Sequence, residues 1–306
     1  ASLKLPSVEF RKLVLRFVHR MDTGEASPES SSAPGIIFDG AVQVCFGKPP
    51  VRASLKLPSV GSSSWTGGKL WPSGLVLAEW LAQQPEDFLQ GARVLELGCG
   101  VAPLPSLVAT QRGAETVLAT DAVEAAVVAA RATFEECTQV QESVRRKSLQ
   151  CQCLDWHGAE HVAQHGAYDV ILVADGVYTE SAAATLAACI RHCWSESPVN
   201  STRHSIYTVL PDERIGAADF CRHMRRQGFR AQALEIGAEI ARAVDRRTFV
   251  EAVEGREITS VVEAGSARKL RLIRWCRFAG LQDDGPALET HFLGAVAAAE
   301  EAVEAR

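Results

Sequence analysis

The chain has 306 residues, of which 47% are hydrophobic and 23% charged, and its formal net charge is -5 at pH 7. This length and balance are typical of a globular protein with a substantial core, and the acidic charge gives no general attraction to nucleic acid. No apolar run reaches the roughly 18 residues of a membrane-spanning helix, and the N-terminal stretch does not resemble a signal peptide. The nine cysteines lack a disulfide-framework spacing, which favours a reducing compartment. We therefore expect a cytoplasmic protein, with the nucleus as a second compartment, and neither a membrane nor a nucleic acid as partner.

Residues 1–64 are predicted to form an N-terminal extension that contains strands and a flexible loop. Strand-like patterns occur over residues 8–18 and 36–46, and a segment rich in Ser, Pro, Glu and Gly lies between them at residues 23–35. The octamer ASLKLPSV occurs twice, at Ala1–Val8 and at Ala53–Val60. A solenoid needs several stacked repeats, so these two copies do not predict one.

Residues 66–81, TGGKLWPSGLVLAEWL, predict a turn that leads into a helix. The glycines and Pro72 are typical of the turn, and apolar side chains then recur at helical spacing up to Leu81, with Glu79 on the polar side. Trp71 precedes this helix, and its indole could equally pack the helix start onto the core.

The next segment, residues 93–121, predicts half of a doubly wound α/β unit. A short apolar strand ends at Leu97, a turn with Gly98 and Gly100 follows, and after a helix a second strand ends at Asp121. Ligands of such folds sit in the crevice beyond the carboxyl ends of the strands.

Two residues of this segment narrow the class of ligand. Glu96 interrupts the apolar strand, and a buried charge is costly unless it is paired, so a ligand with a positive group is the simplest explanation. The dinucleotide fingerprint G-x-G-x-x-G is not completed, because Pro103 stands at the position of its third glycine.

Two further strands are followed directly by polar side chains. The strand predicted at residues 149–154 leads into Asp155 and Trp156. The most apolar run of the chain, residues 168–175, predicts a central fourth strand. This strand ends at Asp175, and Gly176, Val177 and Tyr178 follow it directly.

The whole pattern predicts an α/β fold, a doubly wound Rossmann-like sheet of seven strands in a three-layer sandwich. We place this domain at residues 65–280. Residues 281–306, rich in Ala and Glu, are expected to form an acidic tail, either a loosely attached helix or disordered. The other predicted elements are helices at residues 123–137, 180–194 and 217–227, and strands at 205–210, 230–236 and 270–278.

Four ordered segments resemble the motifs of the family 16 class I (seven-β-strand) methyltransferases, the group that contains many protein-lysine methyltransferases. They are Trp71-Pro72, Glu96-x-Gly98-x-Gly100 with Asp121, Asp155-Trp156, and Asp175-x-x-Tyr178. The resemblance implies that the seven strands are mostly parallel with an antiparallel last strand, and that S-adenosylmethionine (AdoMet) is the cofactor. It implies cofactor-binding roles for Trp71, Glu96, Gly98, Gly100, Asp121, Asp155, Trp156 and Ala174, and catalytic roles for Asp175 and Tyr178.

The resemblance also implies where parts of AdoMet would lie. Glu96 would lie near its amino group, the turn from Gly98 to Ala102 against its methionine part, and Asp121 at its ribose hydroxyls. Asp155 would accept from the adenine amino group while the adjoining indole packs on the purine face. One departure is Ala102 itself, where the family usually has a third glycine, and we expect tolerable crowding there because alanine is the smallest change.

An acid and a phenol after the fourth strand suit methyl transfer to an amine. The acceptor nitrogen must be neutral and in line with the methyl group, so positioning and desolvation supply most of the catalysis. Asp175 would orient a lysine amine as its charge changes, and Tyr178 would form a wall of the transfer channel. The alternative is that Asp175 caps the following helix. DNA and RNA amino-methyltransferases usually carry an N-P-P-aromatic motif at this position, and its absence argues against base amines.

Three functions remain as hypotheses. The first is methyl transfer to a lysine of a partner protein by a monomeric enzyme without a metal. The second is methyl transfer to an arginine or a small metabolite. The V-A-P-L-P wording after the glycines is close to a branch linked to arginine methylation, whereas no acidic pair for a guanidinium is recognisable. The third is a non-catalytic AdoMet-fold scaffold, to which the Ala102 departure points. His157, His161 and His165 are spaced by four, and we expect solvated side chains there rather than metal ligands.

Overall fold

The structure is a computed structural model, and part of the chain falls outside its description. The segments expected at residues 8–18 and 23–35 and the first copy of the octamer lie outside the described residues, as do His161 and His165. The described residues are 38–46, 51–58, 68, 70–158, 167–194, 204–245, 248–253, 256–261, 265–277 and 282–304.

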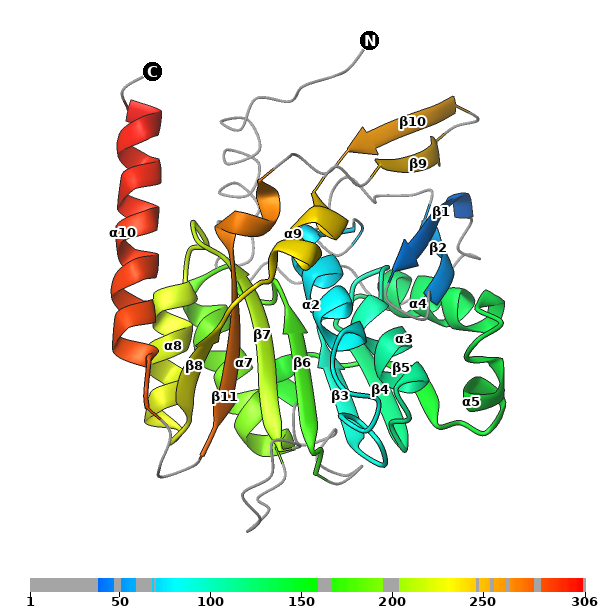
Figure 1. The fold of residues 1–306 in the computed structure, drawn as a ribbon, viewed down its shortest axis with the longest axis horizontal. Coiled ribbons are helices and arrows are strands. Elements are labelled where there is room, and N and C mark those ends of the chain that lie inside the picture. The colour runs from blue at the N-terminus through cyan, green and yellow to red at the C-terminus, as the bar shows by residue number, and fades with distance from the viewer. Residues whose placement is uncertain are drawn as a thin grey trace, which may run out of the picture.

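Seven strands form one sheet in the order β5-β4-β3-β6-β7-β11-β8 (Figure 1). The strands β5, β4, β3, β6 and β7 run parallel to one another, whereas β11 is antiparallel to both β7 and β8. The predicted doubly wound sheet with an antiparallel last strand is therefore confirmed. The strands are β3 Arg93–Leu97, β4 Thr116–Asp121, β5 Leu149–Cys153, β6 Val170–Ala174, β7 Ser205–Pro211, β8 Arg230–Leu234 and β11 Leu270–Cys276.

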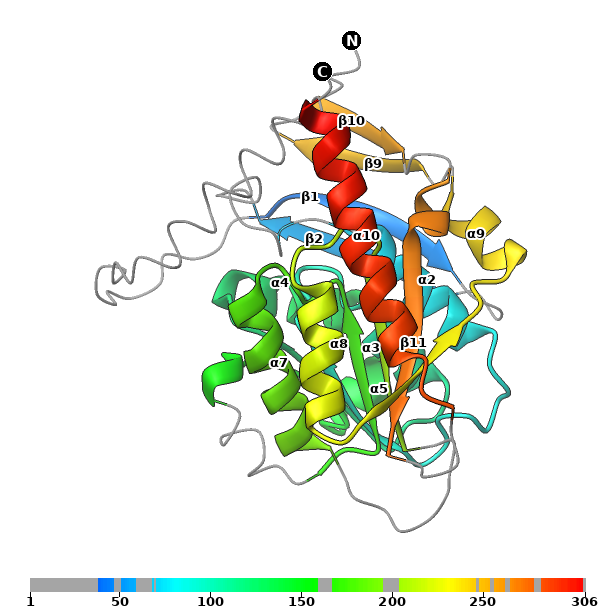
Figure 2. The same cartoon turned by 90° about the vertical axis from the view of Figure 1, so that its left-hand side faces the viewer.

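Helices cover both faces of the sheet, which gives the expected three layers (Figure 2). Successive side chains of a strand point to opposite faces, and β6 shows the consequence. Its Val170 and Leu172 join a buried apolar cluster with α2, α3 and α4, whereas Ile171 and Val173 join a second cluster with α7, α8 and α10. These helices are α2 Pro72–Ala82, α3 Leu104–Gln111, α4 Glu124–Glu136, α7 Glu180–Cys193, α8 Ala217–Arg226 and α10 Gly285–Glu304.

The polar side predicted for α2 is wrong at Glu79, which is buried. The helix contacts α3 on the sheet face and also α9, a short helix at Ala238–Val244. A helix that is covered on more than one side buries side chains beyond the stripe that faces the sheet.

Two small hairpins were not predicted, apart from the strand β1 at Phe38–Phe46. Residues 53–58 of the second octamer copy lie in β2, Val51–Pro58, which pairs with β1. The other hairpin joins β9, Thr248–Val253, to β10, Arg256–Val261. β2 contacts α4 and β1 contacts β9, and Figure 1 shows both hairpins above the end of the sheet at which β11 begins.

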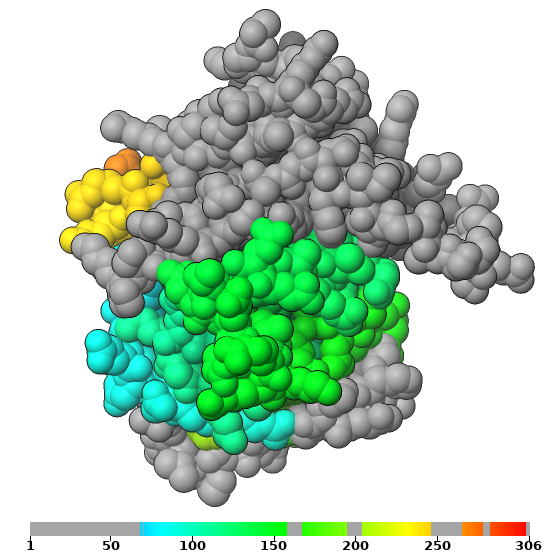
Figure 3. All heavy atoms as spheres, turned by 90° about the vertical axis from the view of Figure 1, so that its right-hand side faces the viewer, coloured from blue at the N-terminus to red at the C-terminus, as the bar shows by residue number. Residues whose placement is uncertain are grey.

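At the β5 end of the sheet, α4 and the short helix α5, Gln141–Arg145, form the surface of the described residues (Figure 3). A 3-10 turn, η2 at Trp156–Gly158, follows β5, and a second, η3 at Ser266–Lys269, precedes β11. Within the described ranges, no helix combines the length and the apolar character that crossing a bilayer requires.

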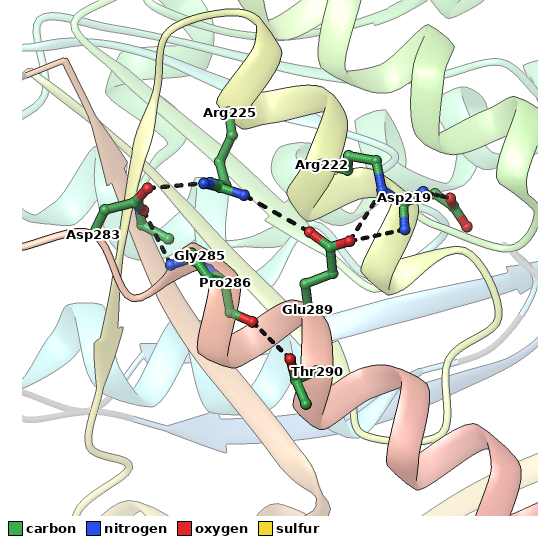
Figure 4. Close-up of polar contacts among 9 residues, drawn as sticks. Asp219, Arg222, Arg225, Asp283, Gly285, Pro286, Glu289 and Thr290 are labelled. Carbon is green, nitrogen blue, oxygen red and sulfur yellow. Dashed lines mark hydrogen bonds and ion pairs between the residues drawn. The ribbon is translucent and has the colours of Figure 1, made fainter.

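The C-terminal helix α10 is attached more closely than the acidic tail we expected. Phe292 is fully buried in the cluster with α8, and Arg222 of α8 binds Glu289 of α10 at 2.9 Å. Arg225 of α8 also binds Asp283, just before α10, at 3.1 Å (Figure 4). The first half of the helix is therefore part of the folded domain.

Candidate functional site

The carboxyl ends of the parallel strands bring distant segments together at one edge of the sheet. β3 lies between β4 and β6, with Glu96 opposite Ala119 on one side and Leu172 on the other. The strand order reverses between β3 and β6, and this kind of switch point is where open α/β sheets bind ligands. The loops after β3, β4, β5, β6 and β7 therefore form the candidate site.

The turn after β3 requires both of its glycines. Gly98 and Gly100 have φ angles of 73° and 58°, a region that glycine occupies without steric cost. The N–H groups of Gly98 and Cys99 both donate to the carbonyl of Thr120 at 2.9 Å. The turn is thus tied to the end of β4.

Ala102 is compatible with this turn. Among the described residues, positive φ angles outside glycine occur at Lys147 and Asp175 and not at Ala102. Ala102 is buried and its carbonyl accepts from Leu104 N at 2.7 Å. The backbone therefore needs no glycine at this position.

Glu96 is almost fully buried at the end of β3 and has a partner within the chain. Its Oε2 accepts from the hydroxyl of Ser106 and, at 3.0 Å, from the Ser106 N–H. Ser106 is the third residue of α3, and the first N–H groups of a helix lack partners inside it. Burial raises the pKa of Glu96 to about 7 in spite of these hydrogen bonds. A cation that approached the carboxylate would lower this pKa again.

Asp121 closes the same turn from β4. Its Oδ2 accepts from Gly100 N and its Oδ1 from Val123 N, both at 2.9 Å. Burial raises the pKa of Asp121, and the backbone N–H groups oppose that shift. A carboxylate oxygen has more than one acceptor site, so Asp121 can also accept from the hydroxyl groups of a ligand.

Trp156 connects the turn after β3 to the loop after β6. A Cβ atom added to Gly98 would lie 3.4 Å from Cζ2 of this indole, and one added to Gly176 would lie 3.5 Å from its Cη2. Asp155 beside it is exposed and accepts from the His157 N–H at 3.0 Å, which is the main cause of its lowered pKa. The two neighbours thus lie in different environments, one packed and one in solvent.

Trp71 and Ala174 are both half-buried. Trp71 is the N-cap residue of α2, where its carbonyl accepts from Gly74 N at 3.1 Å. Ala174 is the last residue of β6 and pairs with Val209 of β7.

Asp175 follows β6 in a strained and enclosed position. Its φ angle is 57°, a conformation that costs a non-glycine residue roughly 1 to 3 kcal/mol. The side chain is buried, and its Oδ2 accepts from Arg214 Nη2 at 2.6 Å. Among the described residues, neither Asp175 Oδ1 nor Arg214 Nε has a hydrogen-bond partner, although both atoms are enclosed. Burial raises the pKa of Asp175, and the Arg214 charge opposes that shift.

The loops after β6 and β7 pack directly on each other. The Arg214 guanidinium carbon lies 5.5 Å from the centre of the Tyr178 ring, within the range of a cation–π contact. Gly216, with a φ angle of 83°, lies so close to Thr179 that an added Cβ would be 2.5 Å from the Thr179 carbonyl oxygen. Thr179 caps α7, since its Oγ1 accepts from Ala182 N at 3.0 Å. The alternative in which Asp175 caps this helix is therefore wrong.

Sequence reasoning missed Ser106, Thr179 and Arg214. Ser106 is an ordinary helix residue in sequence, and nothing in its neighbourhood points back to Glu96. Arg214 had a usable signal, because an acid at the end of a buried strand needs a positive partner and the loop after the neighbouring strand is the nearest place for one.

The turn and its acids suit AdoMet, which carries an amino group, two ribose hydroxyls and a sulfonium. Glu96 is a carboxyl whose burial would favour a cationic neighbour, and the turn offers a glycine backbone that a ligand can approach closely. Among the described residues, no group of three or more His, Cys, Asp and Glu side chains could hold a metal ion.

Comparison with known proteins identifies the family of this chain. A family model described as "Lysine methyltransferase" matches residues 53–227. The Schizosaccharomyces pombe protein named protein N-terminal and lysine N-methyltransferase efm7 is 42% identical over 74 residues, which cover 24% of this chain and 28% of that protein. A Cryptococcus neoformans protein of the same name is 36% identical over 104 residues, covering 33% of this chain and 34% of that protein. The chain thus matches about a third of the length of these relatives.

Solved structures with a similar fold include two methyltransferases. A putative SAM-dependent methyltransferase from Streptococcus mutans has a TM-score of 0.48 at 14% identity, covering 82% of this chain and 57% of that one. A putative methyltransferase complexed with SAH has a TM-score of 0.46 at 12% identity, covering 82% and 58%. Because the family model matches more than half of this chain, the chain belongs to the lysine methyltransferase family, whose members depend on S-adenosylmethionine.

Proposed function

We propose that this chain transfers a methyl group from AdoMet to the ε-amine of a lysine in a partner protein. In this proposal the acceptor nitrogen enters between the loops after β6 and β7, where Asp175 and Tyr178 lie. Trp71, Glu96, Gly98, Gly100, Asp121, Asp155, Trp156 and Ala174 would hold the cofactor.

In this reaction the protein has mainly to position the amine and to exclude water. AdoMet supplies a methyl group on a positively charged sulfur, and the amine must present its lone pair in line with the bond that breaks. Asp175 would accept a hydrogen bond from the amine and so orient it, and the buried setting of the carboxylate would exclude water. Tyr178 would flank the path of the methyl group.

One observation supports this proposal most strongly. The buried acid of the D-x-x-Y motif has a strained backbone and an unpartnered Oδ1, and Trp156 connects its loop to the glycine turn. Strain and unsatisfied buried atoms are found together where a ligand completes a site.

Labelling of a cell lysate with [methyl-³H]AdoMet tests the proposal. The wild-type chain should produce labelled methyl-lysine after acid hydrolysis, and Asp175→Asn should reduce the label at least tenfold. Asp219→Asn is the matched control, because it makes the same chemical change at an ion pair on α8. Label in methyl-arginine or in small molecules would contradict the proposal, as would no label at all from a chain that binds AdoMet.

The α-amine of a protein N-terminus is a second candidate acceptor, because the names of the relatives include both amines. An α-amine has an ordinary pKa near 8, compared with about 10.4 for lysine, so it needs less help to lose its proton. Peptide sequencing of the labelled product distinguishes the two acceptors.

We also propose that the enzyme acts as a monomer in a reducing compartment, the cytoplasm or the nucleus. None of the eight described cysteines forms a disulfide, which supports the reducing compartment. We further propose that residues 1–64 are an addition to the methyltransferase domain, which begins at residue 65 and includes the first half of α10 beyond the expected boundary at 280.

A further inference from the structure

We propose that Arg214 is a positioning residue that sets the charge of the methyl-acceptor pocket, so that the pocket selects a neutral amine over an ammonium group. This inference rests on the proposed function, because it places the acceptor nitrogen beside Asp175. It goes further by assigning a role to a residue outside the family motifs considered above.

The contact between Asp175 and Arg214 is a single hydrogen bond, although both groups can form more. A guanidinium commonly grips a carboxylate through two parallel N–H bonds, but here one bond joins Nη2 to Oδ2 at 2.6 Å. Oδ1 of the acid and Nε of the arginine are enclosed without a partner among the described residues. A buried polar group without a partner destabilises the folded chain. The pair therefore retains an acceptor atom that a ligand N–H can satisfy.

The surrounding loop holds Arg214 in place. Its N–H donates to the Pro211 carbonyl and its carbonyl accepts from Ala217 N, both at 3.1 Å. Its guanidinium also lies against the Tyr178 ring. Gly216 fits tightly against the loop after β6, so the arginine is fixed relative to the carboxylate that it contacts.

The start of the same loop is anchored by ion pairs. Asp212 binds Arg271 of β11 at 2.8 Å and His291 of α10 at 3.0 Å. The backbone that carries Arg214 is thus connected to the C-terminal helix, which explains why that helix packs closely on the domain.

The charge of the pair has a chemical consequence for the acceptor. A carboxylate alone would stabilise an ammonium group and raise its pKa, and an ammonium has no lone pair with which to attack. With Arg214 beside it, the carboxylate belongs to a pair of zero net charge. Oδ1 can then accept an N–H from a neutral amine without strongly favouring its protonated form. Arg214 would act through Asp175 rather than by touching the acceptor.

Two cofactor analogues test this charge balance without a known substrate. S-adenosylhomocysteine lacks the methyl group, and sinefungin carries a cationic amine near the position of the methylsulfonium. Titration calorimetry at pH 8 gives the ratio of their affinities for the wild-type chain and for each variant. Arg214→Gln exposes the amine to an unneutralised carboxylate, so the preference for sinefungin should rise at least fivefold. Asp175→Asn leaves the arginine alone, so the preference should fall at least fivefold.

The double variant Asp175→Asn/Arg214→Gln restores zero net charge and should return the ratio to within twofold of wild type. Arg222→Gln is the matched control, because it removes an arginine from ion pairs between α8 and α10 and should leave the ratio unchanged (Figure 4). If Arg214→Gln does not fold, the Asp175→Asn and double variants still decide the question.

A ratio that stays within twofold in all variants would overturn the role of Arg214, as would single variants that shift it in the same direction. These outcomes leave the proposed function intact as long as the wild-type chain binds both analogues. Failure of the wild-type chain to bind either analogue would instead overturn the proposed function itself.

Discussion

The two halves of the candidate site differ in how completely their polar groups are satisfied. In the cofactor half, formed by Glu96, the turn from Gly98 to Ala102 and Asp121, both acids accept hydrogen bonds from backbone N–H groups. In the acceptor half, formed by residues 175–179 and 211–216, the buried Asp175 and Arg214 each retain an unpartnered atom. The first half is built to be rigid before any ligand arrives. The second half retains buried polar atoms that a reacting group can complete.

The largest expected effect is a loss of stability caused by a substitution at Gly216, where the two loops of the acceptor half pack on each other. Gly216→Ala would place a Cβ 2.5 Å from the Thr179 carbonyl oxygen at a φ angle of 83°. Strain and collision together should lower the free energy of unfolding by about 3 kcal/mol or more. Chemical denaturation measures this loss.

Gly294→Ala is the control for that substitution, since an added Cβ there meets nothing within 4 Å and the glycine lies inside α10. Alanine favours a helix over glycine by up to about 1 kcal/mol, so this variant should be as stable as wild type or slightly more stable. Equal stability of the two variants would show that the two loops do not pack as described.

The next effect concerns the cofactor half and depends on pH. The pKa of Glu96 is raised from 4.5 to about 7 in the folded chain, so the folded state binds more protons than the unfolded state between these values. The stability that Glu96 contributes is therefore present at low pH and is lost as the pH rises through 7. Relative to Glu96→Gln, the wild-type chain should lose roughly 2 to 3 kcal/mol of unfolding free energy between pH 5 and pH 8.

Denaturant titrations of both proteins at the two pH values measure this difference. Parallel pH profiles would mean that the carboxyl of Glu96 titrates normally. The cofactor half would then not raise the pKa of Glu96 by burying it.

Much of the fold followed from the sequence because its signals are local. The apolar run of β6, the glycines after β3 and the acid at the end of β4 each identify an element through neighbouring residues. The docking of α10 did not follow, because Arg222 and Glu289 are far apart in the chain and each looks like an ordinary surface charge. The strands of the two hairpins, β1–β2 and β9–β10, were not predicted, except for β1.

The candidate site was predicted unevenly for the same reason. The resemblance supplied Asp121 and Asp175, but their partners come from tertiary contacts. The pairing of Asp175 with Arg214 joins loops that follow two different strands. Single-sequence periodicity carries no information about such a contact.

A smaller effect separates the helix cap at Thr179 from cofactor binding. Thr179→Ala removes the side chain that caps α7, and loss of such a cap costs about 1 kcal/mol. The melting temperature should fall, while the affinity for S-adenosylhomocysteine should change less than threefold. A larger loss of affinity would mean that the cap also organises the cofactor half.

The division of the site into two halves is tested most directly by calorimetry of three proteins with S-adenosylhomocysteine, which has the cofactor's amino group and ribose but no charged sulfonium near Asp175. We expect measurable binding by wild type, at least a tenfold loss of affinity in Asp121→Ala, and less than a threefold change in Asp175→Asn. Loss of affinity in Asp175→Asn with little change in Asp121→Ala would reverse the assignment of the two halves. No binding by a folded wild-type chain would contradict the account as a whole.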